Sequence, residues 1–207
     1  MTVQSAYNQW ASTYDTDDNL TRDLDAQVTK SALENVHCRA MLELGCGTGK
    51  NTLFLAQLAD SVVALDFSPK MLAQAETKVT AAHVQFARAD LTQKWPISDH
   101  SVDYIVCNLV LEHIEDLRFI FSEASRTLTE GGRFFISELH PFKQYLGGKA
   151  NFSQGSRAIE IPAFIHHVSD FLAAALENEL RLIDLGEWWH EHDQNQPPRL
   201  VTFLFEV

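Results

Sequence analysis

Glu43-Leu44-Gly45-Cys46-Gly47-Thr48-Gly49 is the stretch that decides the fold class of this 207-residue chain. It follows a short apolar run at 40–42 and leads into a helical-looking segment at 51–59, so its three glycines lie at a strand-to-helix turn. Because glycine lacks a Cβ atom, the chain can turn tightly there and bring backbone N–H groups to a ligand at the positive end of the next helix. The stretch therefore predicts a nucleotide-type binding site.

The spacing of the glycines separates the common nucleotide-binding motifs. The dinucleotide fingerprint G-x-G-x-x-G, started at Gly45, needs a third glycine where this chain has Lys50. The phosphate-binding loop G-x-x-x-x-G-K-[ST], aligned on Gly49 and Lys50, has Leu44 at its first glycine and Asn51 at its hydroxyl position. Neither motif fits, and the pattern that remains is E-x-G-x-G-x-G.

That pattern resembles the first motif of the class I S-adenosylmethionine-dependent methyltransferases. The resemblance covers nearly the whole chain and is strongest from Glu43 to Leu139. It implies S-adenosylmethionine as the cofactor and transfer of a methyl group to a small-molecule acceptor by direct in-line displacement. A sulfonium cofactor has no pyrophosphate, so an acidic residue just before the loop is compatible with it.

The order of the expected elements is that of an α/β fold. Segment 102–108 is a near-continuous apolar run of the kind buried on both faces of a parallel sheet. Segments 181–187 and 200–207 have only a polar loop between them, so they are expected to pair as a hairpin. The resemblance implies a doubly wound, mostly parallel seven-stranded sheet that ends in this antiparallel hairpin. The other expected elements are strands at 61–65, 83–89 and 133–139, and helices at 69–80, capped by Ser68, at 116–128, closed by the glycines of 129–132, and at 168–176.

Acidic residues stand at the ends of two of these strands. The strand at 61–65 ends at Asp66, 17 residues after Gly49, which is close to the spacing of about 20 expected for a ribose-binding acid. A carboxylate there can accept hydrogen bonds from both ribose hydroxyls. The strand at 83–89 ends at Asp90, where the resemblance implies a contact to the adenine amino group.

Composition and charge exclude several other classes of protein. At 23.4 kDa the chain is expected to form a single domain, 1–207. No basic region precedes an apolar stretch at the N-terminus and no apolar run approaches the ~18 residues of a membrane span, so we expect neither a signal peptide nor a membrane partner. Three scattered cysteines indicate reduced thiols in a cytoplasmic protein. A net charge of −12 with 16 basic residues argues against a nucleic-acid partner.

The N-terminal segment adds to the expected cofactor site. Residues 7–15 resemble the Tyr/Ala/Tyr-Asp segment that begins many small-molecule methyltransferases of the quinone-biosynthesis type. The match implies a helical lid over 1–37, with Tyr14 on the cofactor and Tyr7 or Trp10 facing the acceptor. A segment that only packs against the core is the alternative. The residues expected to bind the cofactor are Tyr14, Glu43, Gly45, Gly47, Gly49, Asp66, Phe67, Met71, Asp90, Leu91 and Asn108.

The acceptor site is expected in segment 140–167, between the fifth strand and the next helix. This flap should lie over the carboxyl edge of the sheet, where open α/β folds bind ligands, and a hairpin is expected within 152–161 around Gln154-Gly155-Ser156. Aromatic side chains around a few polar groups suit a small-molecule pocket. A structural flap whose aromatic residues complete the core is the alternative. The expected acceptor-binding residues are Tyr7, Trp10, Phe142, Tyr145, Phe164 and His166.

Histidines are the candidates for acid–base chemistry and for metal binding. Direct methyl transfer needs a base only when the acceptor must lose a proton, and His113 and His140, each just beyond a strand, are the two candidates. His166 and His167, as neighbours on a strand, would point to opposite faces and could not share an ion. The cluster at 190–193 is expected to be solvated, so we expect no metal site.

Two other classes of function remain compatible with the motifs. One is an NAD-dependent oxidoreductase on a related fold, which Lys50 disfavours. The other is a non-catalytic protein that binds S-adenosylmethionine but has lost the chemistry. Fold by itself does not separate these classes.

Overall fold

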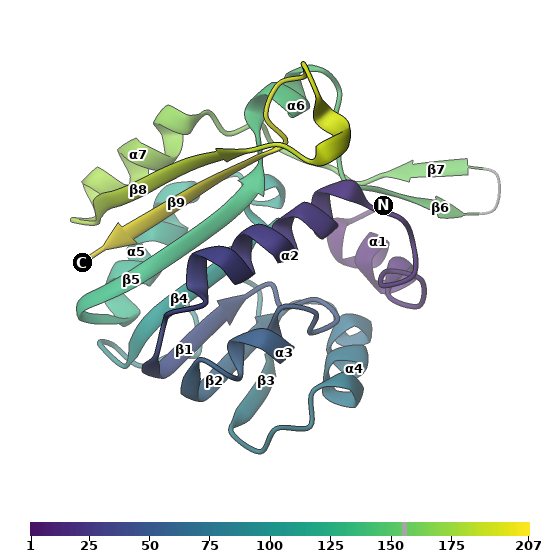
Figure 1. Ribbon diagram of the computed structural model, residues 1–207. Helices are drawn as coiled ribbons and strands as arrows, with labels where there is room; N and C mark the ends of the chain where they lie inside the picture. The colour runs from purple at the N-terminus through teal and green to yellow at the C-terminus, as the bar shows by residue number, and fades with distance from the viewer. Residues whose placement is uncertain (155–156) are drawn as a thin grey trace.

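The computed structural model describes residues 1–154 and 157–207 and is built around one seven-stranded sheet with helices on both faces (Figure 1). The strand order is β3-β2-β1-β4-β5-β9-β8. The first five of these strands run parallel to one another, whereas β9 is antiparallel to both of its neighbours. The predicted fold class is therefore confirmed. The strands are β1 (Cys38–Leu44), β2 (Ala59–Asp66), β3 (Val84–Arg88), β4 (Val102–Asn108), β5 (Leu128–Leu139), β8 (Arg181–Trp188) and β9 (Leu200–Glu206).

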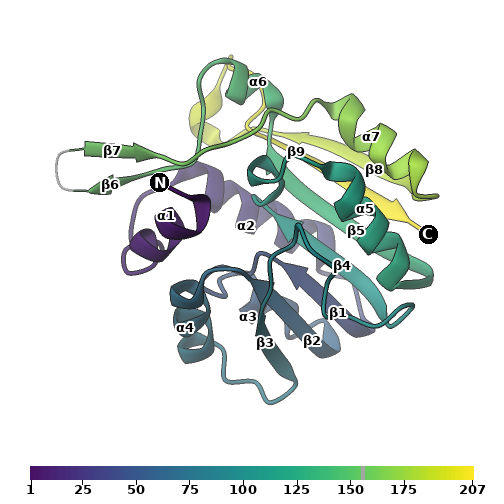
Figure 2. The same cartoon turned by 180° about the vertical axis from the view of Figure 1, so that it is seen from behind.

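The predicted cap at Ser68 is present, and the helix expected from residue 116 is capped by Asp116. The Ser68 hydroxyl accepts a hydrogen bond from the Met71 N–H, and the Asp116 carboxylate accepts one from the Arg118 N–H. Helices α2 and α3 lie on one face of the sheet, and α5 and α7 on the other (Figures 1 and 2). The helices are α1 (Val3–Trp10), α2 (Leu20–Leu33), α3 (Thr52–Leu55), α4 (Pro69–Lys78), α5 (Leu117–Thr127), α6 (Pro141–Tyr145) and α7 (Val168–Glu177), with 3-10 turns η1 (Leu111–His113) and η2 (Glu191–Asp193).

The core has two halves because neighbouring residues of a strand point to opposite faces of the sheet. On one face, Leu42 and Ile105 pack with α5 and α7. On the other face, Met41 and Val106 pack with Leu33 and the residues around α3. Within the described residues, no helix is both long and apolar enough to cross a membrane.

Three local expectations were wrong. The helix after the glycine loop spans only Thr52–Leu55, because β2 already begins at Ala59. The glycines of 129–132 do not cap α5, which ends at Thr127; they lie within β5, where Gly131 has φ +72° and the register against β4 shifts. His167 is not on a strand but precedes α7 as its N-cap.

The flap at 140–167 consists of α6 and a projecting two-stranded hairpin, β6 (Asn151–Gln154) and β7 (Arg157–Glu160) (Figure 1). The two strands pair as predicted, while Gly155 and Ser156 lie outside the described residues. The base of the hairpin packs on α1, where the Trp10 and Phe152 rings stack with centroids 5.5 Å apart. The N-terminal segment and the flap, far apart in the chain, therefore share a small core.

Candidate active site

The three glycines of the loop after β1 all have left-handed backbone angles, but they serve different contacts. φ is +70° at Gly45, +53° at Gly47 and +76° at Gly49. A Cβ atom at Gly45 would lie 2.2 Å from the Val110 Cγ2, and one at Gly49 would lie 3.1 Å from the Ala75 Cβ. A Cβ at Gly47 would meet nothing within 4 Å. Gly47 thus borders open space suited to a ligand, whereas Gly49 allows close packing on α4 and is not at the cofactor position expected for it.

A cavity lies at the carboxyl ends of β1 to β4, beside this loop. We call it the cofactor cavity. It brings together residues from five segments that the sequence places far apart, as expected for an open α/β sheet. Nine of the eleven expected cofactor residues line it: Tyr14, Gly45, Gly47, Asp66, Phe67, Met71, Asp90, Leu91 and Asn108.

Asp66 is held in place by the backbone around it. One carboxylate oxygen accepts a hydrogen bond from the Gly47 N–H at 2.9 Å, and the other accepts one from the Ser68 N–H at 2.7 Å. The side chain is only 7% exposed, and burial raises the pKa of its carboxyl group. The glycine loop and the acid after β2 are therefore one connected unit at the cavity wall.

A smaller chamber adjoins the cofactor cavity and shares Gly45, Gly47 and Asn108 with it. Cationic and acidic side chains line it: Arg22 and Lys50 are cationic, Asp25 is acidic, and Glu43 is a buried carboxyl group. The Asn108 amide donates to Asp25 at 2.8 Å, and burial raises the pKa of Glu43 to about 8. A chamber with both signs of charge suits a zwitterionic amino-acid group, such as the methionine end of S-adenosylmethionine.

Arg22 and Asp25 were missed in the sequence. Their helix, α2, carries an apolar stripe through Leu24 and Val28, which indicates packing and hides the polar residues between. Asp25 is 4% exposed and Arg22 is 8% exposed. Polar residues of this kind in an amphipathic helix become recognisable only when the helix is seen to cross the end of the sheet.

A second, larger cavity opens between the N-terminal segment and the flap. We call it the acceptor cavity; it encloses about 380 Å³, against about 120 Å³ for the cofactor cavity. Tyr7, Tyr14 and Leu109 line both cavities, so the two meet there. Leu109 has φ +55°, a backbone conformation that is rare for a non-glycine residue and is concentrated at functional sites.

The flap reaches the acceptor cavity with different residues from those expected. Tyr7 and Trp10, which were expected to face the acceptor, line this cavity. Phe142 and Tyr145 do not: they share the outward side of α6 and are each 54% exposed, because Pro141 and Gln144 occupy its buried side. Phe164 and His166 do not line the acceptor cavity either. Phe164 is 41% exposed, and the His166 ring is hydrogen-bonded to the Ile114 carbonyl. The flap instead contributes Lys143 and the segment 147–151.

His113 lines the cofactor cavity and accepts a hydrogen bond there. Its Nδ1 lies 2.8 Å from the Pro162 carbonyl, which only accepts, so Nδ1 carries the proton. Its Nε2 therefore accepts from the Tyr7 hydroxyl, 2.8 Å away. Burial lowers the pKa of His113 and raises that of Tyr7, which keeps both groups neutral at neutral pH.

His140 has a structural position. Its Nδ1 accepts a hydrogen bond from the Phe142 N–H at 3.1 Å, as the N-cap of α6, and its Nε2 lies 3.0 Å from the Glu187 carboxylate. Neither nitrogen is free to take a proton, and His140 lines neither cavity. This placement argues against the base role expected for His140.

Glu112 is a cavity residue that was not among the sequence candidates. It is 6% exposed and lines the acceptor cavity, and one of its oxygens lies 3.8 Å from the His113 Nε2. Burial raises the pKa of Glu112 to about 7. The sequence gives no reason to single out Glu112 as a site residue, because an acidic residue beside a histidine after a strand can equally well face solvent.

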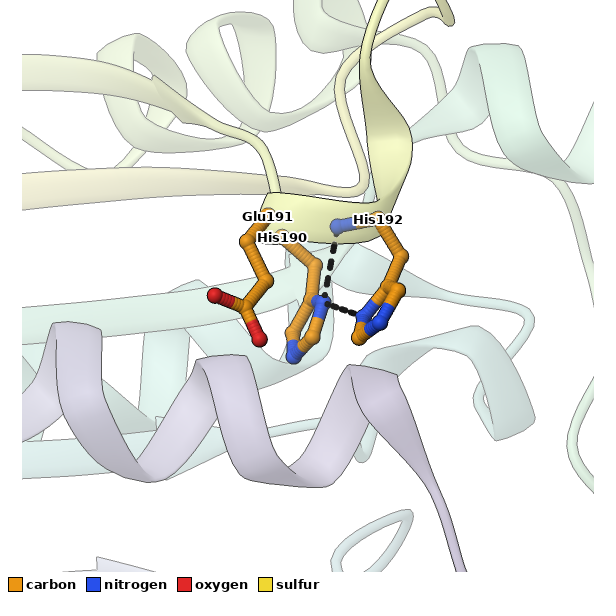
Figure 3. A group of neighbouring side chains, drawn as sticks. All are labelled: His190, Glu191 and His192. Carbon is orange, nitrogen blue, oxygen red and sulfur yellow. Dashed lines mark hydrogen bonds between the residues drawn. The ribbon is translucent and has the colours of Figure 1, made fainter.

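The histidine cluster in the loop between β8 and β9 lies above α2 (Figure 3). The Nδ1 atoms of His190 and His192 are 3.0 Å apart, and possible ligand atoms of these residues and Glu191 all lie within 4.8 Å of one another. Glu191 and His192 are exposed, and no fourth ligand joins them from the described part of the chain. The absence of a metal site stays a prediction.

The sheet order, the glycine loop and the acid at the end of β2 together define an α/β enzyme of the class that binds a nucleoside-containing cofactor at the carboxyl ends of its strands. Residues 42–136 match a family described as "Methyltransferase domain". The chain belongs to the class I S-adenosylmethionine-dependent methyltransferases, and it is an enzyme with S-adenosylmethionine as its cofactor. The oxidoreductase and non-catalytic alternatives find no support in these comparisons.

Two methyltransferases are similar to the chain in sequence. The chain is 29% identical to the uncharacterized methyltransferase AN0656 of Emericella nidulans, over 87% of this chain and 76% of that protein. It is 32% identical to the malonyl-[acyl-carrier protein] O-methyltransferase of Paenibacillus sp. strain JDR-2, over 67% of this chain and 55% of that protein.

Solved structures show the same fold at low sequence identity. An S-adenosylmethionine dependent methyltransferase from Mesorhizobium loti superimposes with a TM-score of 0.76 at 20% identity, covering 91% of this chain and all, 100%, of the other. The N-methyltransferase NodS from Bradyrhizobium japonicum, in complex with S-adenosyl-L-homocysteine, superimposes with a TM-score of 0.75 at 17% identity. The superposition covers 100% of this chain and 98% of NodS.

Proposed function

We propose that this enzyme methylates a small molecule held in the acceptor cavity. The observation that carries the proposal is that the acceptor and cofactor cavities meet at Tyr7, Tyr14 and Leu109. Ligands in the two cavities would therefore approach each other beside these three residues, and direct transfer requires donor and acceptor to come into contact there. The acceptor cavity is enclosed by the N-terminal segment and the flap, which suits a small molecule better than a folded protein.

In this proposal the cofactor's nucleoside occupies the cofactor cavity and its amino-acid end occupies the charged chamber. The Asp66 carboxylate accepts hydrogen bonds from the ribose hydroxyls, and Met71 and Asp90 border the adenine. Arg22 binds the carboxylate of the amino-acid end, and Asp25 lies near its ammonium group. The open space over Gly47 leaves room for the ligand between these two ends.

The N-terminal segment acts as a lid in this proposal. The Asp15 carboxylate accepts hydrogen bonds from the Thr48 hydroxyl at 2.7 Å and from the Lys78 ammonium at 2.6 Å, which ties the segment to the glycine loop. Stacking of Trp10 on Phe152 ties it to the flap. A closed lid of this kind would exclude water and hold donor and acceptor in contact.

The cofactor supplies a methyl group activated by a sulfonium, which leaves without help from an acid. The chain's own residues therefore need only orient the acceptor and, where the acceptor must lose a proton, receive it. Glu112 and His113 are the groups placed for that role. The His113 Nε2 is an acceptor already occupied by Tyr7, while the Glu112 carboxyl has a pKa of about 7, which suits proton transfer at neutral pH.

Two measurements test the proposal. Calorimetric titration should show binding of S-adenosylmethionine and S-adenosylhomocysteine but not of NAD. Incubation with methyl-labelled cofactor and a fractionated metabolite extract should label a compound of low mass. In a parallel incubation with whole-cell extract, label found only in protein or carrier-bound fractions would contradict a small-molecule acceptor while leaving the enzyme class intact.

A further inference from the structure

The acceptor cavity has a charge character opposite to that of the chain as a whole. The chain has 28 acidic and 16 basic residues, for a net charge of −12. The lining of the acceptor cavity reverses this ratio, because four basic side chains meet there with only two acidic ones, Asp18 and Glu112. The basic residues come from three places in the fold: Arg22 from α2, Lys143 and Lys149 from the flap, and Arg199 from the residue before β9. Lys149 is paired with Glu160 at 3.1 Å.

Two of these cations share one carboxylate. Asp193, which is 3% exposed, accepts two hydrogen bonds of 2.6 Å from Arg199 and one of 3.2 Å from the Lys143 ammonium. Its remaining capacity is used by the His190 N–H at 3.0 Å. Asp193 therefore orients both cations but neutralises only one positive charge, so one remains uncompensated at the cavity wall.

Arg22 also lacks a charge partner. Its guanidinium lies over the rings of Trp10 and Tyr14, 5.2 Å and 4.1 Å from their centroids, and it donates to the backbone carbonyls of Tyr14 and Asp17. Among the residues that the structure describes, no carboxylate forms an ion pair with it, and its Nε has no hydrogen-bond partner. A buried cation without a counter-ion is costly, so Arg22 favours an anion, and in the proposed function that anion is the carboxylate of the cofactor. Lys143 and Arg199 are therefore the cations left for an anion of the acceptor.

The positions of Lys143 and Arg199 show which end of the acceptor would meet them. Both line the acceptor cavity and neither lines the cofactor cavity or the charged chamber. The contact between the cavities lies instead at Tyr7, Tyr14 and Leu109. An anion bound by the two cations is thus separated from the place of methyl transfer, and it would anchor the acceptor without being methylated.

We propose that the acceptor carries a carboxylate or phosphate group that binds Lys143 and Arg199, and that a different atom of the same molecule receives the methyl group. This inference rests on the proposed function. The nucleophilic atom bonds to the methyl carbon as the carbon–sulfur bond breaks, and the electrons of that bond stay on sulfur. Any proton lost by the nucleophile passes to Glu112 or to water. The anchoring anion takes no part, so the product keeps its negative charge.

The first test uses matched probes and calorimetry, with and without S-adenosylhomocysteine. Phenylphosphate and benzoate are compared with the uncharged phenol and benzyl alcohol. We expect the anions to bind at least ~10-fold more tightly than their uncharged matches, since ionic hydrogen bonds contribute roughly 1.5–3 kcal/mol. The stronger binder of the two anions identifies phosphate or carboxylate as the preferred group.

Charge-neutral variants locate the anion site. Lys143→Met should reduce anion affinity about tenfold, whereas Lys143→Arg should largely retain it. Lys30→Met, an exposed lysine of α2, is the matched control and should change nothing. Retained anion preference in a folded Lys143→Met protein, or equal affinity for charged and uncharged probes, would overturn the proposal.

The second test reads the charge of the product. Labelled product from a metabolite extract is passed over an anion-exchange resin at pH 8. Mass-spectrometric fragmentation of the labelled product then locates the methyl group. A retained product with the methyl group on another atom supports the proposal. A methyl group on the carboxylate or phosphate itself, or a product that has no anionic group, overturns it. Failure to bind S-adenosylhomocysteine would count against the proposed function, while the probe titrations without cofactor still decide the anion preference.

Discussion

The Tyr7 hydroxyl and the His113 Nε2 lie 2.8 Å apart, although 106 residues separate them in the chain. This bond joins α1 to the turn that follows β4, where the two cavities meet. It also leaves Nε2 of a neutral histidine bonded to a hydroxyl that burial keeps protonated. The N-terminal segment is thus held to the site by a polar contact as well as by packing.

Removing that contact should loosen the lid. Tyr7→Phe leaves the buried His113 Nε2 without its donor, at a cost of about 1–3 kcal/mol. We expect a lower kcat/KM and faster proteolytic cleavage near the N-terminus, at unchanged fold. Tyr104→Phe, which removes a hydroxyl from a buried tyrosine that lines neither cavity, is the control. Equal effects of the two substitutions would mean that the Tyr7 hydroxyl has no special role.

Replacing Asp66 should weaken the binding of the cofactor. Asp66→Ala removes the charged acceptor for the ribose hydroxyls, which costs roughly 1.5–3 kcal/mol, or about ten- to a hundredfold in affinity. Calorimetry with S-adenosylhomocysteine measures the change. Asp60→Ala, at the exposed start of the same strand, should bind normally. Unchanged affinity in a folded Asp66→Ala protein would remove the ribose assignment.

The glycines of the loop should respond differently to alanine. Gly47→Ala places a methyl group in open space, so we expect a modest loss of stability from its φ of +53°, about 1 kcal/mol, with a large loss of cofactor affinity. In Gly49→Ala the new Cβ atom would lie 3.1 Å from the Ala75 Cβ, and the positive φ would also be strained. The free energy of unfolding should therefore fall by a further ~1–3 kcal/mol. Thermal unfolding and calorimetry, applied to both variants, separate the two effects.

Because of Glu112, the free energy of unfolding should fall as the pH rises. Its pKa is raised from 4.5 to about 7 in the folded protein, so folding disfavours its charged form. The stability associated with the protonated carboxyl is complete below about pH 4.5 and is lost by pH 7, on the order of 3 kcal/mol. Glu112→Gln should reduce this fall in the free energy of unfolding between those two pH values. Glu115→Gln, an exposed neighbour, should leave the profile as it is in the wild type.

His140 should prove structural. His140→Ala removes the N-cap of α6 and its bond to Glu187, so the free energy of unfolding should fall by about 0.5–2 kcal/mol. Because neither ring nitrogen is free, the pH dependence of turnover should keep its shape. Loss of the acid limb of the pH–rate profile in this variant would restore the base role that the sequence suggested.

The sequence predicts the cofactor side of the site better than the acceptor side, for a physical reason. Asp66 and Asp90 follow strands whose carboxyl ends must meet at one edge of the sheet, so topology fixes their neighbourhood. Phe142 and Lys143 are consecutive residues, and which of them enters the cavity depends on how a five-residue helix packs. A short helix has too few residues to show its buried face as a periodic pattern, so the sequence favours the aromatic residues over the lysine as the lining of the cavity.

The division of the chain between the two cavities bears on how such an enzyme changes over time. From Gly45 to Ile114, one unbroken stretch supplies nearly all of the cofactor cavity. The walls of the acceptor cavity come mainly from before residue 23 and after residue 138. Under the proposed function, mutations accumulating in the two terminal regions can alter what is methylated while the donor-binding centre is inherited unchanged. The same boundary offers a place to exchange terminal regions between relatives when a new acceptor is wanted.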